Sequence, residues 1–195
     1  DFVDVFVIGE GEEVSLELFD LYRTAKRENW EKRRFLVAAA EIGGCYVPAL
    51  YTPHYDEKGN FTGITPSDGT PERIVKRIVK DLDHAYYPQS PVVPSTEVVH
   101  DRVMLEVMRG CIRGCRFCQA GHTFRPIREK SPETLIRQGI TQAENTGYDE
   151  ISLTSLSTTD YRKLDELCDG LIDWCEKRHI SLALPSQRAD KFSVE

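Results

Sequence analysis

The chain has 195 residues, of which 40% are hydrophobic and 29% are charged, and its net charge is −7. This composition is typical of a soluble globular protein with room for one ordinary domain or two small ones. The negative charge argues against a nucleic-acid-binding surface over the whole chain, and no apolar run reaches the ~18 residues of a membrane span. Because no signal peptide is visible either, we expect a cytoplasmic protein without membrane contact.

The first part of the chain predicts short strands around a helix. Residues 4–8 form an apolar run closed by Gly9-Glu-Gly-Glu12, which predicts a buried strand and a tight turn. Residues 14–26 have the apolar spacing of an amphipathic helix. Residues 46–51 and 61–65 flank a polar, Gly-containing turn and predict a hairpin.

A proline-rich stretch predicts a division of the chain. Before it, residues 74–82 have helical spacing, but their β-branched side chains favour a strand. Residues 86–95 then carry three prolines, which cannot continue a helix or a central strand. We therefore predict a linker at residues 88–96, between one domain at residues 1–87 and another at residues 97–195.

The second part of the chain has a regular alternation of strands and helices. Its first helix has local end signals: Ser131 as cap, Pro132 in the first turn and Gly147 after the last turn. Alternation at this spacing predicts βαβ units and a parallel sheet, with loops meeting at the carboxyl ends of the strands. The predicted elements are a strand at 103–108, a helix at 132–145, a strand at 150–154, a helix at 161–177 and a strand at 180–184.

Three cysteines follow the first of these strands. Cys111, Cys115 and Cys118 have the spacing C-x3-C-x2-C in a loop with two glycines. Thiolates are soft ligands that select zinc, copper(I) or iron–sulfur clusters. A closed zinc site needs a fourth ligand, whereas a cubane cluster held by three cysteines leaves one iron open. The spacing therefore favours an iron–sulfur cluster.

Other interpretations of the cysteines stay open at this point. A zinc site could be completed by His122 or His100. Disulfide pairing is disfavoured, because the remaining cysteines lie singly in apolar surroundings and nothing indicates secretion. We interpret those remaining cysteines as small core residues: Cys45, Cys168 and Cys175.

Basic residues crowd the same loop. They are either a solvated surface or a positive rim that attracts an anionic cluster, carboxylate or phosphate group. The residues are Arg109, Arg113, Arg116, Arg125, Arg128 and Lys130.

The cysteine spacing, with the aromatic Phe117 before Cys118, resembles the motif of the radical S-adenosylmethionine (SAM) enzymes. The resemblance implies a [4Fe–4S] cluster on Cys111, Cys115 and Cys118, with SAM on the open iron and Phe117 near the adenine. Reductive cleavage of SAM would give a 5′-deoxyadenosyl radical that abstracts hydrogen from a substrate. The cluster and SAM would perform this chemistry, and the protein would bind and orient them.

The loops after the next two strands supply the expected SAM contacts. The loop at 155–160 offers hydroxyl and backbone groups for the amino group of SAM, from Ser155, Ser157 and Thr158. The loop at 185–190 offers Ser186 and Arg188 for its carboxylate or ribose. Many radical SAM proteins have a Gly-Gly-Glu run in the first of these loops, which this chain lacks. Thr159 or Asp160 alternatively serves as N-cap of the following helix.

Residues 4–12, the cysteine loop and the runs 153–157 and 184–188 resemble one branch of the family more closely. That branch carries an N-terminal cobalamin-binding-type domain, and the chain looks most like an uncharacterised bacterial subfamily of it. The implied fold is α/β, with the first three strands of a partial (βα) radical SAM barrel after the remnant of a Rossmann-like domain. Cobalamin is implied by this resemblance alone, because its usual ligand motif is not in the sequence.

The resemblance implies an enzyme that uses the radical for methyl or methylthio transfer, with RNA, a ribosomal component or a small metabolite as substrate. A flavodoxin- or ferredoxin-type electron donor is expected. No constellation of His, Glu or Asp names a catalytic residue. The chain starts at Asp1 without a methionine and stops at Glu195 inside a predicted helix start, so we expect a segment of a longer protein. The alternative functions are a non-catalytic zinc-binding module and an inactive truncated fragment.

Overall fold

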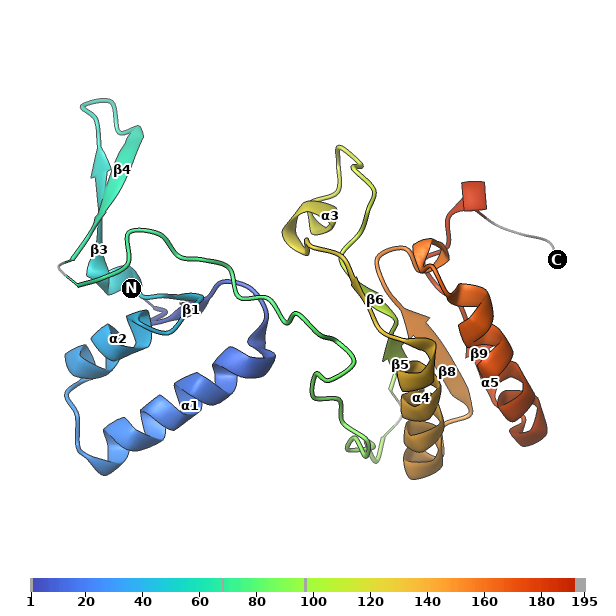
Figure 1. Cartoon of the computed structure of the whole chain (residues 1–195). Helices are drawn as coiled ribbons and strands as arrows, with labels where there is room; N and C mark the ends of the chain where they lie inside the picture. Colours follow the sequence, from blue (N-terminus) through green and yellow to red (C-terminus); the bar gives the residue numbers. More distant parts are fainter. Residues whose placement is uncertain (1, 68, 97, 192–195) are drawn as a thin grey trace. The chain divides into compact units, whose positions relative to one another are not determined.

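The computed structural model describes residues 2–67, 69–96 and 98–191. The chain forms two compact units, residues 1–79 and residues 80–195 (Figure 1). Among the described residues, no helix is both long enough and apolar enough to cross a membrane.

The first unit is built on two helices. The predicted helix is confirmed as α1 (Gly11–Arg27), with Glu12 and Glu13 in its first turn and Lys26 and Arg27 in its last, the order that the helix dipole favours. The helix α2 (Lys32–Ala40), which the sequence analysis did not predict, follows it. A small core forms where α2 meets the segment that follows it, made of Leu36, Ala39, Ala40, Val47, Leu50 and Tyr51.

Two antiparallel pairs complete this unit. The predicted buried strand is only β1 (Phe6–Val7), and it is exposed; it pairs with β2 (Cys45–Tyr46). The hairpin is present, but its first strand is β3 (Tyr51–Tyr55), so the predicted strand at 46–51 is wrong. Pro48 begins a short 3-10 helix there (η1, Pro48–Leu50) and ends the extended conformation. Its second strand is β4 (Phe61–Pro66), as predicted.

The strand favoured at 74–82 does not form. Only Arg77 pairs there, through a parallel bridge to Gly9, in which the Arg77 N–H donates to the Ile8 carbonyl (2.8 Å). Two residues after Arg77, the N–H of Val79 donates to the buried carboxylate of Glu10 (2.6 Å) and not to the backbone carbonyl of a neighbouring strand. A side-chain acceptor has therefore replaced the ladder that β-branched residues would have joined.

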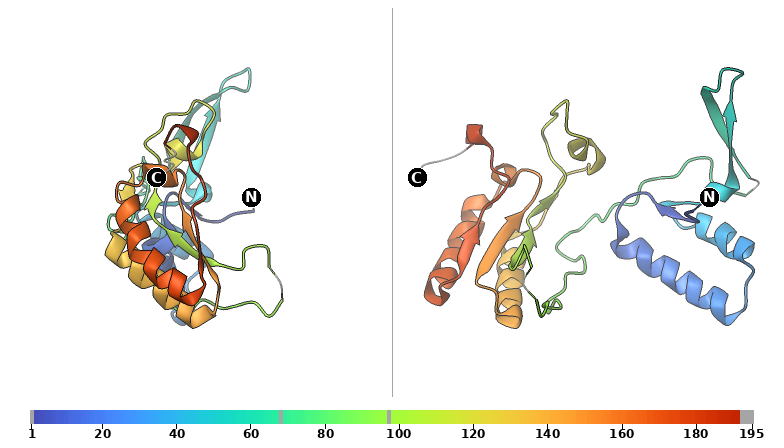
Figure 2. Two further views of the ribbon diagram at one scale, coloured as in Figure 1. Left: turned by 90° about the vertical axis from the view of Figure 1, so that its right-hand side faces the viewer. Right: turned by 180° about the vertical axis from the view of Figure 1, so that it is seen from behind.

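The second unit contains the predicted parallel sheet, in the order β5-β8-β9. Its strands are β5 (Val103–Glu106), β8 (Glu150–Thr154) and β9 (Ser181–Ala183), with Leu105 opposite Leu153 and Ile151 opposite Leu182. The helices α4 (Pro132–Thr146) and α5 (Leu164–Arg178) cover one face of this sheet (Figure 2). This arrangement follows from right-handed crossovers between parallel strands.

The predicted ends of α4 are confirmed, because local capping groups define them. The Ser131 hydroxyl accepts a hydrogen bond from the Thr134 N–H (3.3 Å), and Gly147 has the left-handed conformation that ends the helix (φ 75°). The core between helices and sheet is fully buried at its centre, where its residues include Leu105, Leu135, Ile151, Leu153, Leu167 and Leu171.

Much of the predicted linker lies in the second unit. The amide of Asn145, on α4, donates to the Gln89 carbonyl and the Ser90 hydroxyl (both 2.9 Å). The Tyr87 hydroxyl lies 2.8 Å from the Met104 carbonyl, on β5. The first residues of the proline-rich segment are thus hydrogen-bonded to β5 and α4, which follow it in the chain. The domain boundaries at residues 87 and 97 stay a prediction.

The Gly9–Arg77 bridge gives a test of the first unit. Gly9 has φ 119°, and a Cβ there would lie 2.1 Å from the Arg77 carbonyl oxygen. We expect Gly9→Ala to lower the free energy of unfolding by ~3 kcal/mol, because a rigid backbone contact must break in addition to the cost of the conformation. The control is Gly59→Ala, where φ is 80° but no atom lies within 4 Å. Chemical denaturation of both variants would contradict this account if Gly59→Ala proved equally unstable.

Candidate functional site

The three cysteines lie in a loop closed by a small antiparallel pair at the carboxyl end of β5. The strand β6 (Met108–Arg109) pairs with β7 (Arg128–Glu129), so residues 110–127 leave the sheet and return to it (Figure 1). The loop includes the short helix α3 (Ala120–Thr123). Gly110 starts the loop with φ 92°, and a Cβ there would lie 2.6 Å from the Phe124 carbonyl oxygen. Glycine is therefore required where the two ends of the loop approach each other.

The loop gathers two of the three cysteines around one glycine. A Cβ on Gly121 would lie 3.8 Å from the Cys118 sulfur and 3.9 Å from the Cys111 Cβ. Backbone N–H groups donate to both sulfurs, from Arg113 to Cys111 and from Gly121 to Cys118 (both 3.4 Å). Within the part of the chain that the structure describes, no three His, Cys, Asp or Glu side chains lie close enough together to hold a metal ion.

Of the other three cysteines, Cys45 and Cys175 are buried as predicted, whereas Cys168 is half-buried. All six cysteines are unpaired thiols. Burial raises the pKa of the Cys45, Cys168 and Cys175 thiols, which keeps them protonated and poor as ligands. Cys111 is buried, whereas Cys115 and Cys118 are half-buried.

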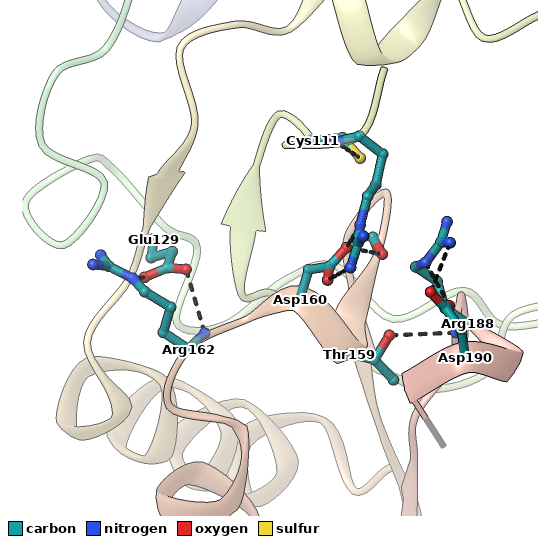
Figure 3. Close-up of polar contacts among 9 residues, drawn as sticks. Cys111, Glu129, Thr159, Asp160, Arg162, Arg188 and Asp190 are labelled. Atoms are coloured by element: carbon teal, nitrogen blue, oxygen red, sulfur yellow. Dashed lines mark hydrogen bonds and ion pairs between the residues drawn. The ribbon is translucent and has the colours of Figure 1, made fainter. Parts of the chain in front are cut away.

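A buried ion pair ties the cysteine loop to the loop that follows β8 (Figure 3). The Arg113 Nε donates to Asp160 Oδ2 (2.8 Å), and a second guanidinium nitrogen binds Oδ1. The Ser157 hydroxyl also donates to Asp160 Oδ2 (2.8 Å). The Asp160 side chain is only 4% exposed. The hydrogen bond from Arg113, aided by the one from Ser157, lowers the pKa of the Asp160 carboxyl to about 2 although burial opposes the shift.

The expected helix cap at Thr159 or Asp160 is wrong. The helix α5 begins at Leu164, its cap position is Lys163, and no side chain caps it. Residues 158–160 form a separate 3-10 turn (η2, Thr158–Asp160). The Asp160 carboxylate is therefore occupied by Arg113, not by the amino end of the helix.

Hydrogen bonds also connect the loops after β8 and β9. The Thr158 N–H donates to the Ser186 carbonyl (3.2 Å), and the Arg188 N–H donates to the Thr159 hydroxyl (3.3 Å). The three loops at the carboxyl edge of the sheet are thus joined, as the strand order predicts.

The residues expected to bind SAM differ in their accessibility. Ser157 and Thr158 are buried, and the Thr158 hydroxyl lies 3.0 Å from that of Ser155. Ser186 is exposed with φ 58°, and the Arg188 guanidinium pairs with Asp190 (2.9 and 3.1 Å). Phe117 is 92% exposed. Binding by Ser157 or Thr158 would therefore compete with hydrogen bonds inside the loop.

The basic residues near the cysteines are not a uniform positive rim. The Arg109 guanidinium makes two hydrogen bonds of 2.8 Å with the Glu106 carboxylate, and Arg113 binds Asp160. Lys130 is buried, with its Nζ 4.7 Å from the centre of the Tyr87 ring. Part of this positive charge is therefore paired with carboxylates or lies against an aromatic ring within the second unit.

A cavity of about 250 Å³ lies at the carboxyl ends of β5 and β8. Thr154 lines it, and its Oγ1 atom is buried without a hydrogen-bond partner among the described residues. Sequence analysis did not single out this position, because nothing local distinguishes a threonine at a strand end. The lining residues are Glu106, Met108, Arg109, Gly110, Phe124, Thr154, Ser155 and Leu156.

A three-thiol loop beside a cavity at the carboxyl edge of a parallel sheet defines an α/β protein with a potential metal and ligand site. Comparison with known proteins agrees. Residues 105–193 match the family described as "Radical SAM superfamily", and residues 1–48 match "Radical SAM proteins, N-terminal". The chain therefore contains segments similar to the N-terminal and core domains of radical SAM proteins.

A similar protein is known from Methanocaldococcus jannaschii. The chain is 26% identical over 195 residues to the uncharacterized protein MJ0966 of that organism. The matched region covers 99% of this chain and 35% of MJ0966. The chain thus spans about a third of the length of this relative.

The Asp160 carboxylate gives a pH-dependent test of the loop connection. Its pKa of about 2 lies below the ordinary 3.8, so it contributes stability above pH ~4 that is lost as the pH falls towards 2. We expect Asp160→Asn to lower the free energy of unfolding by ~2 kcal/mol at pH 7, and the difference to shrink through that window. Chemical denaturation of both proteins at several pH values from 7 to 2 measures this difference in the free energy of unfolding. Asp190→Asn, in a more exposed pair, should have a smaller effect, and a pH-independent loss in Asp160→Asn would contradict the assignment.

Proposed function

We propose that this domain binds a [4Fe–4S] cluster through Cys111, Cys115 and Cys118, and binds SAM beside it. The observation that carries the proposal is the three-cysteine loop at the carboxyl edge of the parallel sheet, within the segment that matches the superfamily. When bound, the cluster supplies the electron for reductive cleavage of SAM to a 5′-deoxyadenosyl radical. Everything else in the reaction depends on how the protein positions and encloses these groups.

The donor set of the loop fits a cluster with three protein ligands. Three thiols lie on eight consecutive residues, from Cys111 to Cys118. Two of their sulfurs accept hydrogen bonds from backbone N–H groups, an interaction that stabilises negative charge on sulfur and tunes cluster potentials. Gly121 leaves the space between Cys111 and Cys118 free of a side chain. Cluster binding then requires Cys115 to join the other two.

The cavity beside the loop supports binding of SAM there. Its walls are largely apolar, with the Glu106–Arg109 ion pair and Ser155 as polar groups. The unpartnered Thr154 Oγ1 is the kind of buried group that a bound ligand commonly satisfies. On the neighbouring loop, Arg188 and Ser186 are the proposed contacts of the carboxylate or ribose, and the exposed Phe117 is the proposed contact of the adenine. The loop after β8 carries Ser155, Ser157 and Thr158, whose side-chain hydrogen bonds give this loop its shape.

The remaining parts of the proposal rest on the resemblance to the family. The parallel sheet β5-β8-β9 would be the first three strands of a partial barrel. Methyl or methylthio transfer to RNA, a ribosomal component or a small metabolite is the proposed use of the radical, with a flavodoxin- or ferredoxin-type donor. Cobalamin and a Rossmann-like remnant at residues 1–87 belong to the proposed branch. The described part of the first unit contains antiparallel strand pairs and one parallel bridge.

Reconstitution tests the proposed cluster. After anaerobic incubation with iron and sulfide, we expect an electron paramagnetic resonance signal of a reduced [4Fe–4S] cluster that shifts when SAM is added. Replacing Cys111, Cys115 or Cys118 by Ala should abolish this signal, because each removes one of three ligands. Cys168→Ala is the matched control and should retain it. A colourless protein with stoichiometric zinc would overturn the proposal and favour a zinc-binding module.

Thr154 tests the SAM site. We expect Thr154→Val to raise the free energy of unfolding of the SAM-free protein by ~1 kcal/mol, because it removes a buried, unpaired hydroxyl while keeping the shape of the side chain. It should also weaken SAM binding by about tenfold, because one hydrogen bond to the ligand is lost. Chemical denaturation and calorimetric titration with SAM measure the two effects. Thr146→Val, on α4, is the control; unchanged SAM affinity in Thr154→Val would rule out this contact.

A further inference from the structure

Three consecutive residues, starting with the last residue of η2, bind the cysteine loop near both of its ends; Figure 3 shows Asp160 and Arg162. Near the start of the loop, Asp160 binds Arg113. Just past its end, the Tyr161 hydroxyl donates to the Lys130 carbonyl (2.8 Å), and the Arg162 Nε donates to the Glu129 carboxylate (2.7 Å). We call residues 160–162 the anchor tripeptide. The loop is thus fastened at both ends to one short segment of the chain.

The anchor tripeptide is itself fixed in the core. Tyr161 is 3% exposed and belongs to the cluster of buried residues between sheet and helices. Its ring cannot move without opening that core. Residues 160 and 162, on either side of it, are therefore held in place by the packing of the whole unit.

The two ion pairs of the anchor differ in strength. Asp160 is almost fully buried and binds the guanidinium fork of Arg113 through both oxygens. Loss of Arg113 would leave the buried Asp160 carboxylate without its counter-ion, which is costly. Loss of Asp160 would leave the Arg113 guanidinium, which is 29% exposed, without the partner that fixes its position. The Arg162 side chain is 84% exposed, so its pair with Glu129 contributes little. The connection between Asp160 and Arg113 is therefore the one that holds the loop.

This connection acts directly on the first cysteine. The residue whose guanidinium binds Asp160 also supplies the backbone N–H that donates to the Cys111 sulfur (3.4 Å). A displaced Arg113 would therefore lose its N–H···S contact and release the buried Cys111. The effect should be local, because Cys175 lies near the end of α5 and Cys45 lies in the first unit.

We propose that Asp160 is a positioning residue that holds Arg113 and Cys111, at the start of the cysteine loop, in place before any metal is bound. It touches no ligand and acts only through Arg113. A loop ordered in advance loses less conformational entropy when it binds, and a rigid support for ligating side chains raises affinity. The identity of the bound group as an iron–sulfur cluster rests on the proposed function, whereas the ordering of the loop does not.

The test is the alkylation rate of each cysteine in the metal-free protein, measured by iodoacetamide labelling and mass spectrometry. A buried thiol reacts through local opening, so a weaker anchor raises its rate. We expect Asp160→Asn to accelerate alkylation of Cys111 about tenfold, with no change at Cys175. Glu166→Gln, which alters an exposed pair with Lys163, is the control and should leave Cys111 unchanged. An unchanged Cys111 rate in Asp160→Asn would overturn the proposal.

Arg113→Lys separates positioning from general loss of structure. It keeps the positive charge but not the fork that binds both oxygens of Asp160, so we expect an intermediate rate at Cys111. The double variant of Asp160→Asn and Arg113→Lys should react no faster than Asp160→Asn alone, because both changes break one interaction. The alkylation rate of Cys175 reports on folding. If Asp160→Asn also accelerates alkylation of Cys175, the rate at Cys111 in Arg113→Lys decides whether Asp160 positions Cys111. Additive effects of Asp160→Asn and Arg113→Lys on the Cys111 rate would contradict the proposal.

Reconstitution then distinguishes this proposal from the proposed function. We expect Asp160→Asn to retain several-fold less iron and sulfide than the unaltered protein after gel filtration. If the unaltered protein binds no cluster, the proposed function fails while the alkylation result still decides the role of Asp160. If Asp160→Asn matches the unaltered protein in both iron content and Cys111 reactivity, the positioning role fails and the cluster stands.

Discussion

The parallel pairing of β5, β8 and β9 is the constraint on which the site depends. Because the three strands run in one direction, their following loops emerge at one edge of the sheet. The crossovers through α4 and α5 lie on one face and bury the apolar side chains of the strands. The cysteine loop, the serine-rich loop and the arginine-bearing loop, far apart in sequence, therefore become neighbours.

The cysteine loop adds a second constraint to this frame. A long loop at the edge of a sheet would normally have high conformational entropy. Here the β6–β7 pair closes its base, Gly110 permits the close approach of its ends, and the anchor tripeptide fixes residues near both ends. The thiols thus lie on a segment whose two ends are held by hydrogen bonds and ion pairs. Among the described residues, the stretch around Cys115 makes no such bond to the anchor tripeptide. This division suits a loop that must adjust one ligand to complete a site.

Signals confined to neighbouring residues made part of this structure predictable. Ser131, Pro132 and Gly147 define the ends of α4 by their own chemistry, and the apolar runs of β5 and β8 identify buried parallel strands. The strand at 74–82 failed because the Glu10 carboxylate, distant in sequence, occupies the N–H of Val79. The two-residue strands β6 and β7 are too short to have a periodicity. The three cysteines were visible from spacing, but the role of Asp160 was not, because its partner Arg113 lies 47 residues away.

The hydroxyl groups of the serine-rich loop illustrate how the structure changes the expected chemistry of the site. In the sequence Ser157 and Thr158 look like free donors for a ligand, yet both are buried and bonded within the loop. Using the Ser157 hydroxyl for a ligand would cost its hydrogen bond to Asp160, about 1.5 kcal/mol or more because the acceptor is charged. It would also weaken the support of Arg113 and thus of Cys111. The Thr154 hydroxyl has no such bond to lose, because it is unpartnered in the described structure. A ligand in the cavity would therefore gain more from Thr154 than from Ser157, and it would leave the anchor of the cysteine loop intact.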